Sequence, residues 1–194
     1  MNNLPDINRN LVFELQEYGR HITFTKKDNP ITYENSNKYF YIIFSGKIKV
    51  FNLNFKTNRE QTLYMIGKGD MFDTLVLLDG QDHDILTEVI EEGTAIEIPI
   101  DKVREWLDHN ESFKSYFYPY VSKQLRNIEE LATDLSLLDT SERLTKLILK
   151  DIEMSGELLR GLSHTEMGNL IGTVRHVVER HLKKNNILKE RKML

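Results

Sequence analysis

The sequence predicts an α+β protein: an N-terminal antiparallel β jelly roll, a long helix and a C-terminal helix-turn-helix. Three patterns favour this fold class: short strand-like runs over 21–99, a helical apolar repeat over 121–138, and two short helices joined by a tight turn within 161–188. Many short strands separated by turn residues are typical of antiparallel sandwiches and jelly rolls. We therefore expect a β-barrel domain over 1–118, a long helix over 119–138 and a helix-turn-helix domain over 139–194.

Composition restricts the classes to which the chain can belong. It has 194 residues, 40% of them hydrophobic, and no cysteine. The absence of cysteine excludes disulfides, a cysteine-ligated iron–sulfur cluster and thiol redox sensing. No apolar run approaches the ~20 residues of a membrane span. The first ten residues lack the basic and apolar regions of a signal peptide, so we expect a cytoplasmic protein with no membrane segment.

The N-terminal part is expected to be mainly β-structure. A short amphipathic helix is predicted up to about Tyr18. Seven strand-like runs follow, and turn signals such as Ser45-Gly46 and Glu92-Gly93 separate them. The runs cover 21–25, 31–33, 39–44, 47–53, 61–66, 86–90 and 94–98. Barrels of this kind can hold a ligand in their interior, so this domain is a candidate sensor.

Helical spacing begins after residue 99. Asp101 can cap a helix that carries Val103 and Trp106, and a second short helix is predicted over 111–118. Pro119 suits the first turn of a further helix, because its missing N–H costs nothing there. This helix carries an apolar seam about two and a half heptads long, which is typical of a coiled coil. The seam consists of Val121, Leu125, Ile128, Leu131, Ala132, Leu135 and Leu138.

The seam has two interpretations, because a short apolar stripe does not specify the surface that it meets. It can pair with a second copy of the chain in a homodimer, or it can lie on the barrel of its own chain. After the seam, the sequence Asp139-Thr140-Ser141-Glu142 forms a capping box that begins the next helix. Asp139 is therefore the natural hinge between the domains.

The stretch 161–188 predicts the helix-turn-helix. Ser163 and Glu166 have the spacing of a capping box, so the first helix should start at His164. Gly172 supplies the left-handed conformation at which a helix can end. Thr173 can cap the second helix. Because both helices and the tight turn fall within about 25 residues, the whole stretch matches the size of this motif.

The second helix has two distinct faces. Val174, Val177, Val178, His181 and Leu182 lie on a packing arc, where His181 is a core histidine or, as the alternative, a pH sensor. The opposite arc is polar and cationic. Such a helix fits the major groove, because arginine can pair bidentately with guanine and lysine can neutralise phosphate. A solvated helix with ordinary i,i+4 ion pairs is the alternative. The candidate DNA-binding residues are Ser163, Thr173, Arg175, His176, Glu179, Arg180, Lys183 and Lys184.

Charge is distributed unevenly along the chain. The net charge is −4, yet residues 160–194 carry about +5 and the remainder about −9. Attraction to phosphate depends on the local patch, and an acidic body disfavours binding in the wrong orientation. The asymmetry favours a region that binds double-stranded DNA, attached to an acidic module.

The order of these elements resembles the Crp/Fnr family of bacterial transcription regulators over nearly the whole chain. Residues 39–48 look like its strand-turn-strand, 138–144 like its hinge, and 171–175 with the following Val178, Arg180, Leu182 and Lys183 like its recognition helix. The resemblance implies a cyclic-nucleotide-binding-like barrel, a winged helix-turn-helix, and homodimers that bind a near-palindromic operator and contact RNA polymerase.

The resemblance also implies roles for single residues. Arg175 and Arg180 match the two arginines with which the family contacts bases. His176 stands where the family has a glutamate. Because glutamate accepts a hydrogen bond from cytosine whereas neutral histidine has one donor and one acceptor, the half-site is expected to differ from the family's commonest one.

The sensor segment departs from the family. Cyclic-nucleotide-binding members hold ribose and phosphate with a Gly-Glu pair followed by Arg-Ser or Arg-Thr, but here Asp73-Thr74 stands at the first position and no arginine follows through residue 89. On the long helix, Ile128-Glu129 replaces the family's base-contacting Thr-Ser. Uncompensated carboxylates repel phosphate, so we expect no control by cAMP. The acidic residues of the segment are Asp70, Asp73, Asp79, Asp82, Asp84 and Glu88.

The effector is left open. A hard metal could bind Asp79, Asp82, His83 and Asp84, although an acidic tip is more often solvated, and we assign no metal site. Haem bound through His21 or His83 would make the chain a haem-sensing regulator by analogy. The domain could also have lost its ligand. The rival class, a metal-binding cupin-like enzyme, needs clustered histidines, and no catalytic motif is found, so we expect no enzyme. A subunit that acts only through protein contacts is a third class.

Overall fold

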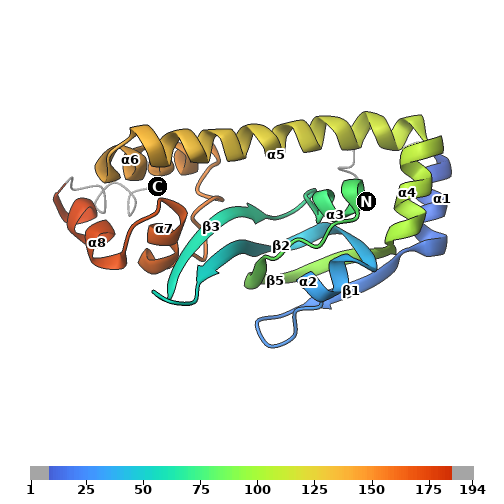
Figure 1. Ribbon diagram of the computed structural model, residues 1–194, viewed down its shortest axis with the longest axis horizontal. Coiled ribbons are helices and arrows are strands. Elements are labelled where there is room, and N and C mark those ends of the chain that lie inside the picture. Colours follow the sequence, from blue (N-terminus) through green and yellow to red (C-terminus); the bar gives the residue numbers. More distant parts are fainter. Residues whose placement is uncertain (1–8, 185–194) are drawn as a thin grey trace. The chain divides into compact units, whose positions relative to one another are not determined.

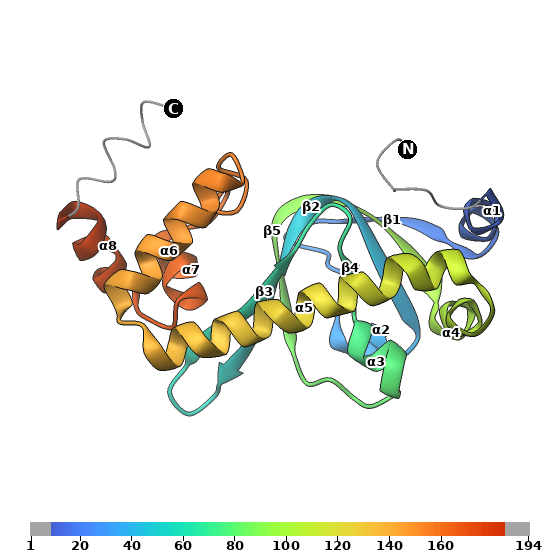
Figure 2. The same ribbon diagram turned by 90° about the horizontal axis from the view of Figure 1, so that it is seen from above.

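The computed structural model describes residues 9–184, which contain the helices and strands shown in Figures 1 and 2. The described residues belong to two units by their internal contacts. The N-terminal unit takes in Met1–Phe51 and Met65–Asn127, and the C-terminal unit takes in Asn52–Tyr64 and Ile128–Leu194. The elements are α1 (Arg9–Tyr18), β1 (Arg20–Phe24), α2 (Tyr33–Ser36), β2 (Tyr39–Asn54), β3 (Arg59–Ile66), β4 (Met71–Phe72), α3 (Thr74–Asp79), β5 (Leu86–Pro99), α4 (Ile100–His109), α5 (Glu111–Leu137), α6 (Thr140–Glu153), α7 (His164–Leu170) and α8 (Arg175–Lys184).

The strands form one five-stranded sheet in the order β1–β5–β2–β3, with β4 paired to β2 off this path. Strands β2 and β5 are antiparallel, and Tyr39 lies opposite Pro99 while Phe51 lies opposite Leu86. The α+β class with an N-terminal β domain and C-terminal helices is confirmed. The sheet is not closed into a barrel, because β1 and β3 stand at the two ends of the strand order.

Two predicted turns are irregularities inside long strands. The register of β2 against β5 shifts at three places between Ile43 and Ile48. A Cβ atom on Gly93 would lie 2.0 Å from the carbonyl oxygen of Ser45, so the two backbones approach closely there. Only glycine permits this approach, and Gly46 also has a φ of +87°. The four predicted strands on either side are therefore the two strands β2 and β5.

Several helices also differ from the sequence-based expectation. The predicted strand over 31–33 is absent from the described structure, since Tyr33 begins α2, and α3 was not predicted. The short helix over 111–118 and the helix expected from Pro119 are one helix, α5, with Pro119 inside it. The helix continues through Pro119 despite the loss of the one backbone hydrogen bond that a proline cannot donate. Asp101 lies in the first turn of α4, which follows Pro99 rather than an Asp101 cap.

The core of the N-terminal unit lies between the sheet and the helices α3, α4 and α5. It contains buried aromatic side chains, among which Trp106 meets Phe113 edge-on and Phe113 stacks on Phe117. The hydroxyl of Tyr120 accepts from the backbone N–H of Met71 at 3.0 Å and donates to its carbonyl at 2.9 Å. This pair of bonds fixes β4 against α5. Helices α1 and α4 both contact β5 and lie together in Figure 1.

The described part of the C-terminal unit is helical apart from the strand ends within Asn52–Tyr64. Helices α6, α7 and α8 pack around Leu144, Met167, Ile171, Val178 and Leu182. No strand occurs within 139–184, so the wing that the resemblance implies is not seen among these residues. Of the basic residues over 160–194, those beyond Lys184 lie outside the described range. Within residues 9–184, none of the helices has the length and apolar character needed to cross a membrane.

Candidate nucleic-acid interface

Helix α7 begins at His164, as predicted, because Ser163 and Glu166 complete a capping box. The hydroxyl of Ser163 accepts from the backbone N–H of Glu166 at 3.3 Å, and the Glu166 carboxylate accepts from the backbone N–H of Ser163. Two of the N–H groups that a helix start leaves unpaired are thereby satisfied. The Ser163 side chain thus fixes the start of the motif.

The turn between α7 and α8 depends on two glycines. Gly172 has a φ of +67°, which confirms the left-handed position predicted there. A Cβ atom on Gly168 would lie 2.9 Å from the carbonyl oxygen of Thr173, so the chain folds back closely over Gly168. Thr173 does not cap α8, because the helix begins at Arg175 and Val174 stands at the capping position. Instead, the backbone N–H of Thr173 donates to the carbonyl of Gly168 at 2.9 Å.

Helix α8 packs through one face, largely as the sequence predicts. Val178 and Leu182 are buried against α6 and α7, and Val177 and His181 are half-buried. Val174 is an exception, since it is 49% exposed. It precedes the first turn of the helix, so helical periodicity does not place it on the packing arc.

The opposite side of α8 is exposed and basic. Arg175, His176, Arg180, Lys183 and Lys184 are all exposed, and we call these five residues the cationic face. Most of its members are permanently charged at neutral pH. Glu179, which was predicted on the same side, is half-buried.

Glu179 is the centre of a small polar network. Its Oε1 atom accepts from Nε of Arg175 at 2.7 Å and lies 3.5 Å from Nδ1 of His164. The pKa of the Glu179 carboxyl is lowered, mainly by the Arg175 bond and secondly by His164. The network therefore connects the first turn of α7 to the first turn of α8.

The hairpin tip over Asn52–Tyr64 also belongs to this unit, and sequence reasoning did not find it. Nη2 of Arg59 donates to the carbonyl of Gly172 at 2.8 Å, and Nε2 of Gln61 donates to the carbonyl of Asn169 at 3.0 Å. Nδ2 of Asn169 in turn donates to Glu60 at 2.8 Å. We call these three bonds the hairpin clasp. These contacts join residues more than 100 positions apart, and such contacts leave no periodic pattern in the sequence from which they could be predicted.

Polar contacts hold the segments on both sides of the predicted hinge, Asp139. Asp139 caps α6 in a capping box with Glu142, as predicted. Arg143 donates from Nε to the carbonyl of Ile171 at 2.8 Å and from Nη1 to that of Leu138 at 2.7 Å. The ammonium groups of Lys146 and Lys150 contact carboxylates on α5, and the pairs are Lys146–Glu130, Lys146–Asp134 and Lys150–Glu130.

The apolar seam of α5 is partly uncovered. Leu125 is 62% exposed, Ile128 39% and Leu135 37%. Val121 is half-buried and packs against the core of the N-terminal unit. Leu137, which was not predicted as part of the seam, is 77% exposed.

Comparisons with known proteins agree with this architecture. The model of the cyclic nucleotide-binding domain matches residues 22–110. The chain is 24% identical over 187 residues to the CRP-like cAMP-activated global transcriptional regulator of Mycobacterium tuberculosis, and the match covers 88% of this chain and 83% of that protein. The chain is therefore similar to Crp/Fnr-type regulators in sequence and in fold.

Solved Crp/Fnr-like structures show the same fold at low sequence identity. The c-di-GMP responsive global regulator CLP of Xanthomonas campestris is 18% identical with a TM-score of 0.73, and the match covers 93% of this chain and 92% of that one. FixK2 of Bradyrhizobium japonicum is 17% identical with a TM-score of 0.74, covering 88% and 86%. A transcriptional regulator of the crp/fnr family from Eubacterium rectale is 15% identical with a TM-score of 0.72, covering 96% and 88%.

At the position that the resemblance assigns to the Gly-Glu pair, the structure has a buried carboxylate. Asp73 is 3% exposed, and its two carboxylate oxygens lie 2.9 and 3.1 Å from Nδ1 of His83. The bond to Asp73 raises the pKa of His83. Asp70 is half-buried and accepts from the backbone N–H of Gly67 at 2.8 Å. Arg104, which was not predicted, donates to the carbonyls at the end of α3.

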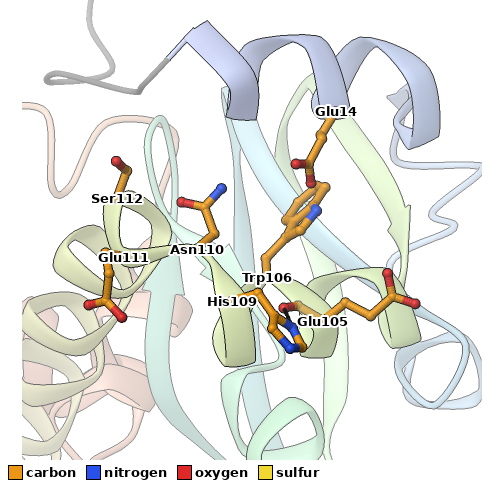
Figure 3. Close-up of a pocket in the computed structure, with 7 residues that line it drawn as sticks. All are labelled: Glu14, Glu105, Trp106, His109, Asn110, Glu111 and Ser112. Atoms are coloured by element: carbon orange, nitrogen blue, oxygen red, sulfur yellow. Dashed lines mark hydrogen bonds between the residues drawn. The ribbon is translucent and has the colours of Figure 1, made fainter.

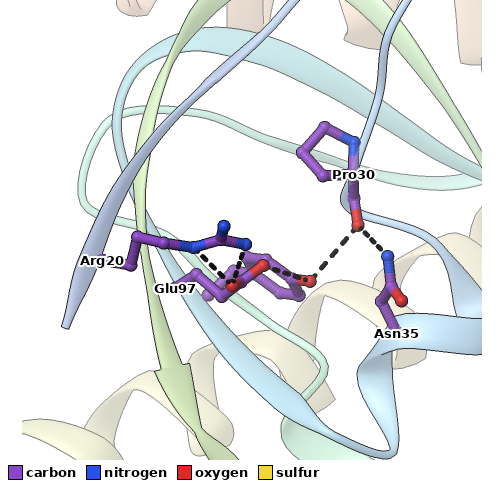
Figure 4. A network of polar contacts seen from close by, with 5 residues as sticks. Arg20, Pro30, Asn35 and Glu97 are labelled. Atoms are coloured by element: carbon purple, nitrogen blue, oxygen red, sulfur yellow. Dashed lines mark hydrogen bonds and ion pairs between the residues drawn. The ribbon is translucent and has the colours of Figure 1, made fainter. Parts of the chain in front are cut away.

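A second buried carboxylate lies on the sheet of the N-terminal unit (Figure 4). Glu97 is 4% exposed, and Oε1 accepts from Nε and Nη2 of Arg20 at 3.1 and 2.6 Å. The hydroxyl of Tyr41 lies 3.1 Å from Oε2 of Glu97 and 3.2 Å from the carbonyl of Pro30, to which Asn35 also donates. Both carboxylate oxygens of Glu97 therefore have a protein partner.

A hollow of about 630 Å³ lies where α1, α4 and the start of α5 meet (Figure 3). Its carboxylates are partly engaged, since Glu105 pairs with Lys102 and Glu111 with Lys114. An acidic lining disfavours a phosphate ligand. The lining residues are Glu14, Glu105, Trp106, His109, Asn110, Glu111 and Ser112.

The residues considered for a metal or haem are not brought together. Among the described residues, no group of three or more histidine, aspartate or glutamate side chains is placed to hold a metal ion. Asp82 accepts from Asn37 at 2.7 Å, and His83 contacts Asp73 instead. His21 is exposed and lies against the ring of Phe44. The enzyme alternative is not favoured, since the relatives reported above are regulators.

Proposed function

We propose that the chain is a sequence-specific DNA-binding transcription regulator that acts as a homodimer on a near-palindromic operator and is not controlled by cAMP. The exposed cationic face of α8 carries this proposal, because a capped and packed helix with such a face can enter the major groove. The proposed DNA contacts are Ser163, Thr173, Arg175, His176, Glu179, Arg180, Lys183 and Lys184. Such a regulator would work in the cytoplasm and contact RNA polymerase, without enzymatic activity.

The exposed seam of α5 supports the homodimer. An isolated helix gains nothing from exposing Leu125 to water, whereas pairing with the same face of a second copy would bury it. A two-fold dimer would place two α8 helices against two half-sites one helical turn apart, about 34 Å along the duplex. The proposed dimer contacts are Val121, Leu125, Ile128, Leu131, Ala132, Leu135 and Leu138.

Independence from cAMP is supported by the chemistry at the nucleotide-binding position. Asp73 is buried there with His83, and no arginine occurs over 69–89 to neutralise a phosphate. A second anion beside a buried carboxylate is electrostatically unfavourable. The Mycobacterium tuberculosis relative is named cAMP-activated, so the expected difference lies in the residues of this segment rather than in the fold.

The test is binding of the purified full-length chain to the DNA upstream of its own gene. Fluorescence anisotropy at ~0.15 M salt with excess competitor DNA would be recorded with and without cAMP. We expect sequence-specific binding whose Kd does not change with cAMP. Loss of all binding in competitor DNA would refute the regulator, and a Kd that falls on addition of cAMP would refute independence from that nucleotide.

Two substitutions on the cationic face should have different effects. Arg180→Ala should weaken binding by about 1–3 kcal/mol and relax specificity at one base pair. Lys184→Ala should weaken binding to all sequences alike and lower the slope of log K against log salt by about one unit. Both are measured as Kd on the operator and on single-base-pair variants at several salt concentrations. Equal affinity of Arg180→Ala and wild type for the operator would contradict base contact by Arg180.

A further inference from the structure

We propose that Glu179 is a positioning residue that presents Arg175 to a guanine of the operator. This inference rests on the proposed DNA binding and assigns a role within that same surface. Glu179 is then not itself a base-reading group. Its carboxylate would hold the arginine in the conformation that reads the base.

The first argument is the atom of Arg175 that the carboxylate occupies. Glu179 accepts from Nε at 2.7 Å, and no hydrogen bond of Nη1 or Nη2 occurs among residues 9–184. A guanine in the major groove offers O6 and N7 as paired acceptors. The two terminal nitrogens of a guanidinium match that pair in a fixed plane, so a bond at Nε leaves the reading edge free.

The second argument is that the carboxylate is itself held. The Glu179 oxygen that accepts from Arg175 also lies 3.5 Å from Nδ1 of His164, the first residue of α7. Glu179 is half-buried between the helices, with 31% of its side chain exposed, whereas 68% of the Arg175 side chain is exposed. A carboxylate tied to both helices therefore orients a side chain that would otherwise sample many rotamers.

The third argument is the contrast with the other arginine of the cationic face. Within the described range, no acidic side chain pairs with Arg180, which is exposed one turn further along α8. A carboxylate on a DNA-facing helix repels phosphate unless a cation compensates it. The Glu179 carboxylate therefore does not raise the general affinity for DNA. Its benefit beside Arg175 is better discrimination between bases. Arg180 serves as the internal control.

The experiment measures discrimination at each base pair of the half-site. Kd is determined for wild type, Glu179→Ala, Glu179→Gln, Arg175→Ala and the Arg175→Ala/Glu179→Ala double variant on the operator and on symmetric single-base-pair variants. The base pair read by Arg175 is identified as the one whose substitution changes the Kd of wild type but not the Kd of Arg175→Ala. Arg180→Ala identifies the second base pair in the same way.

We expect Glu179→Ala to reduce discrimination at the Arg175 base pair by about two- to tenfold, the cost of ordering one long side chain. Discrimination at the Arg180 base pair should be unchanged, and it reports that the motif is folded. Glu179→Gln should retain most of the wild-type discrimination, because its amide oxygen still accepts from Nε. In the Arg175→Ala background, Glu179→Ala should have no further effect on discrimination.

Three outcomes would overturn the inference. Unchanged discrimination at the Arg175 base pair in Glu179→Ala would show that no positioning occurs. An equal loss of discrimination at both base pairs would show that Glu179 has a general structural role. Binding that becomes equally tighter to every sequence would show that Glu179 only repels phosphate. Failure of the proposed function is a separate result: the wild-type protein would then discriminate at no base pair.

Discussion

At the scale of single residues, the chain has a buried carboxylate at the position that the resemblance assigns to the Gly-Glu pair of cyclic-nucleotide-binding members. Asp73 is buried, and His83 is the hydrogen-bond partner of its side chain among the described residues. The residues of this pair are ten positions apart and join the start of α3 to the segment before β5. The sequence suggested an acidic cluster at this place, but helical or strand periodicity contains no information on a pair formed within a loop.

The Asp73–His83 pair should make stability depend on pH. Since the pKa of His83 is raised in the folded chain, its contribution to stability is complete below the unfolded value of about 6.5 and is lost as pH rises through the raised pKa. We expect the free energy of unfolding in urea to fall over this window in wild type and not in His83→Gln. Parallel pH profiles for the two proteins would contradict the pair's contribution.

At the scale of elements, the sequence predicted those features whose causes are local. The capping boxes at Asp139 and Ser163 and the left-handed Gly172 were all predictable, because a cap depends on residues three positions apart. The glycines at 46 and 93 were misread as turns. Glycine permits both a turn and a close approach of two strands, and only the pairing of β2 with β5 decides between them.

Gly168→Ala should destabilise the C-terminal unit. The new Cβ would lie 2.9 Å from the carbonyl oxygen of Thr173, a backbone atom that cannot rotate away. The expected loss is about 1–3 kcal/mol by overpacking, reduced by the ~1 kcal/mol that alanine gains in a helix. Urea unfolding measures it, with Gly67→Ala as the control, since the nearest atom there is 3.6 Å away. Equal stability of the two variants would show that the turn can relax.

At the scale of the whole molecule, the order of elements was predictable and the closure of the sheet was not. Strand-like runs indicate where most of the extended segments lie, but they do not reveal which strands remain at the ends of the strand order. The wholly polar side of α8 and the apolar seam of α5 were visible for the opposite reason, because amphipathicity follows from spacing alone. Under the proposed function, the partners of these two faces are DNA and a second copy of the chain.

The oligomeric state can be tested on that seam. Leu125→Glu should shift the protein from dimer to monomer at micromolar concentration, because it would place two carboxylates within the paired seams. Leu149→Glu is the control, since Leu149 is similarly exposed on α6 but lies outside the seam. Sedimentation velocity distinguishes the two species. A wild-type protein that sediments as a monomer, or a Leu125→Glu variant that stays dimeric, would exclude pairing through this residue.

The hairpin clasp has a consequence for any attempt to use the C-terminal unit as a module. Because Asn52–Tyr64 belongs to that unit, the chain passes from one unit to the other three times. A fragment beginning at residue 128 would leave the carbonyls of Asn169 and Gly172 without the side chains of Gln61 and Arg59. A chimera that grafts this helix-turn-helix onto a foreign effector domain would therefore have to carry a compatible hairpin from the donor, so the unit of exchange is discontinuous in the gene.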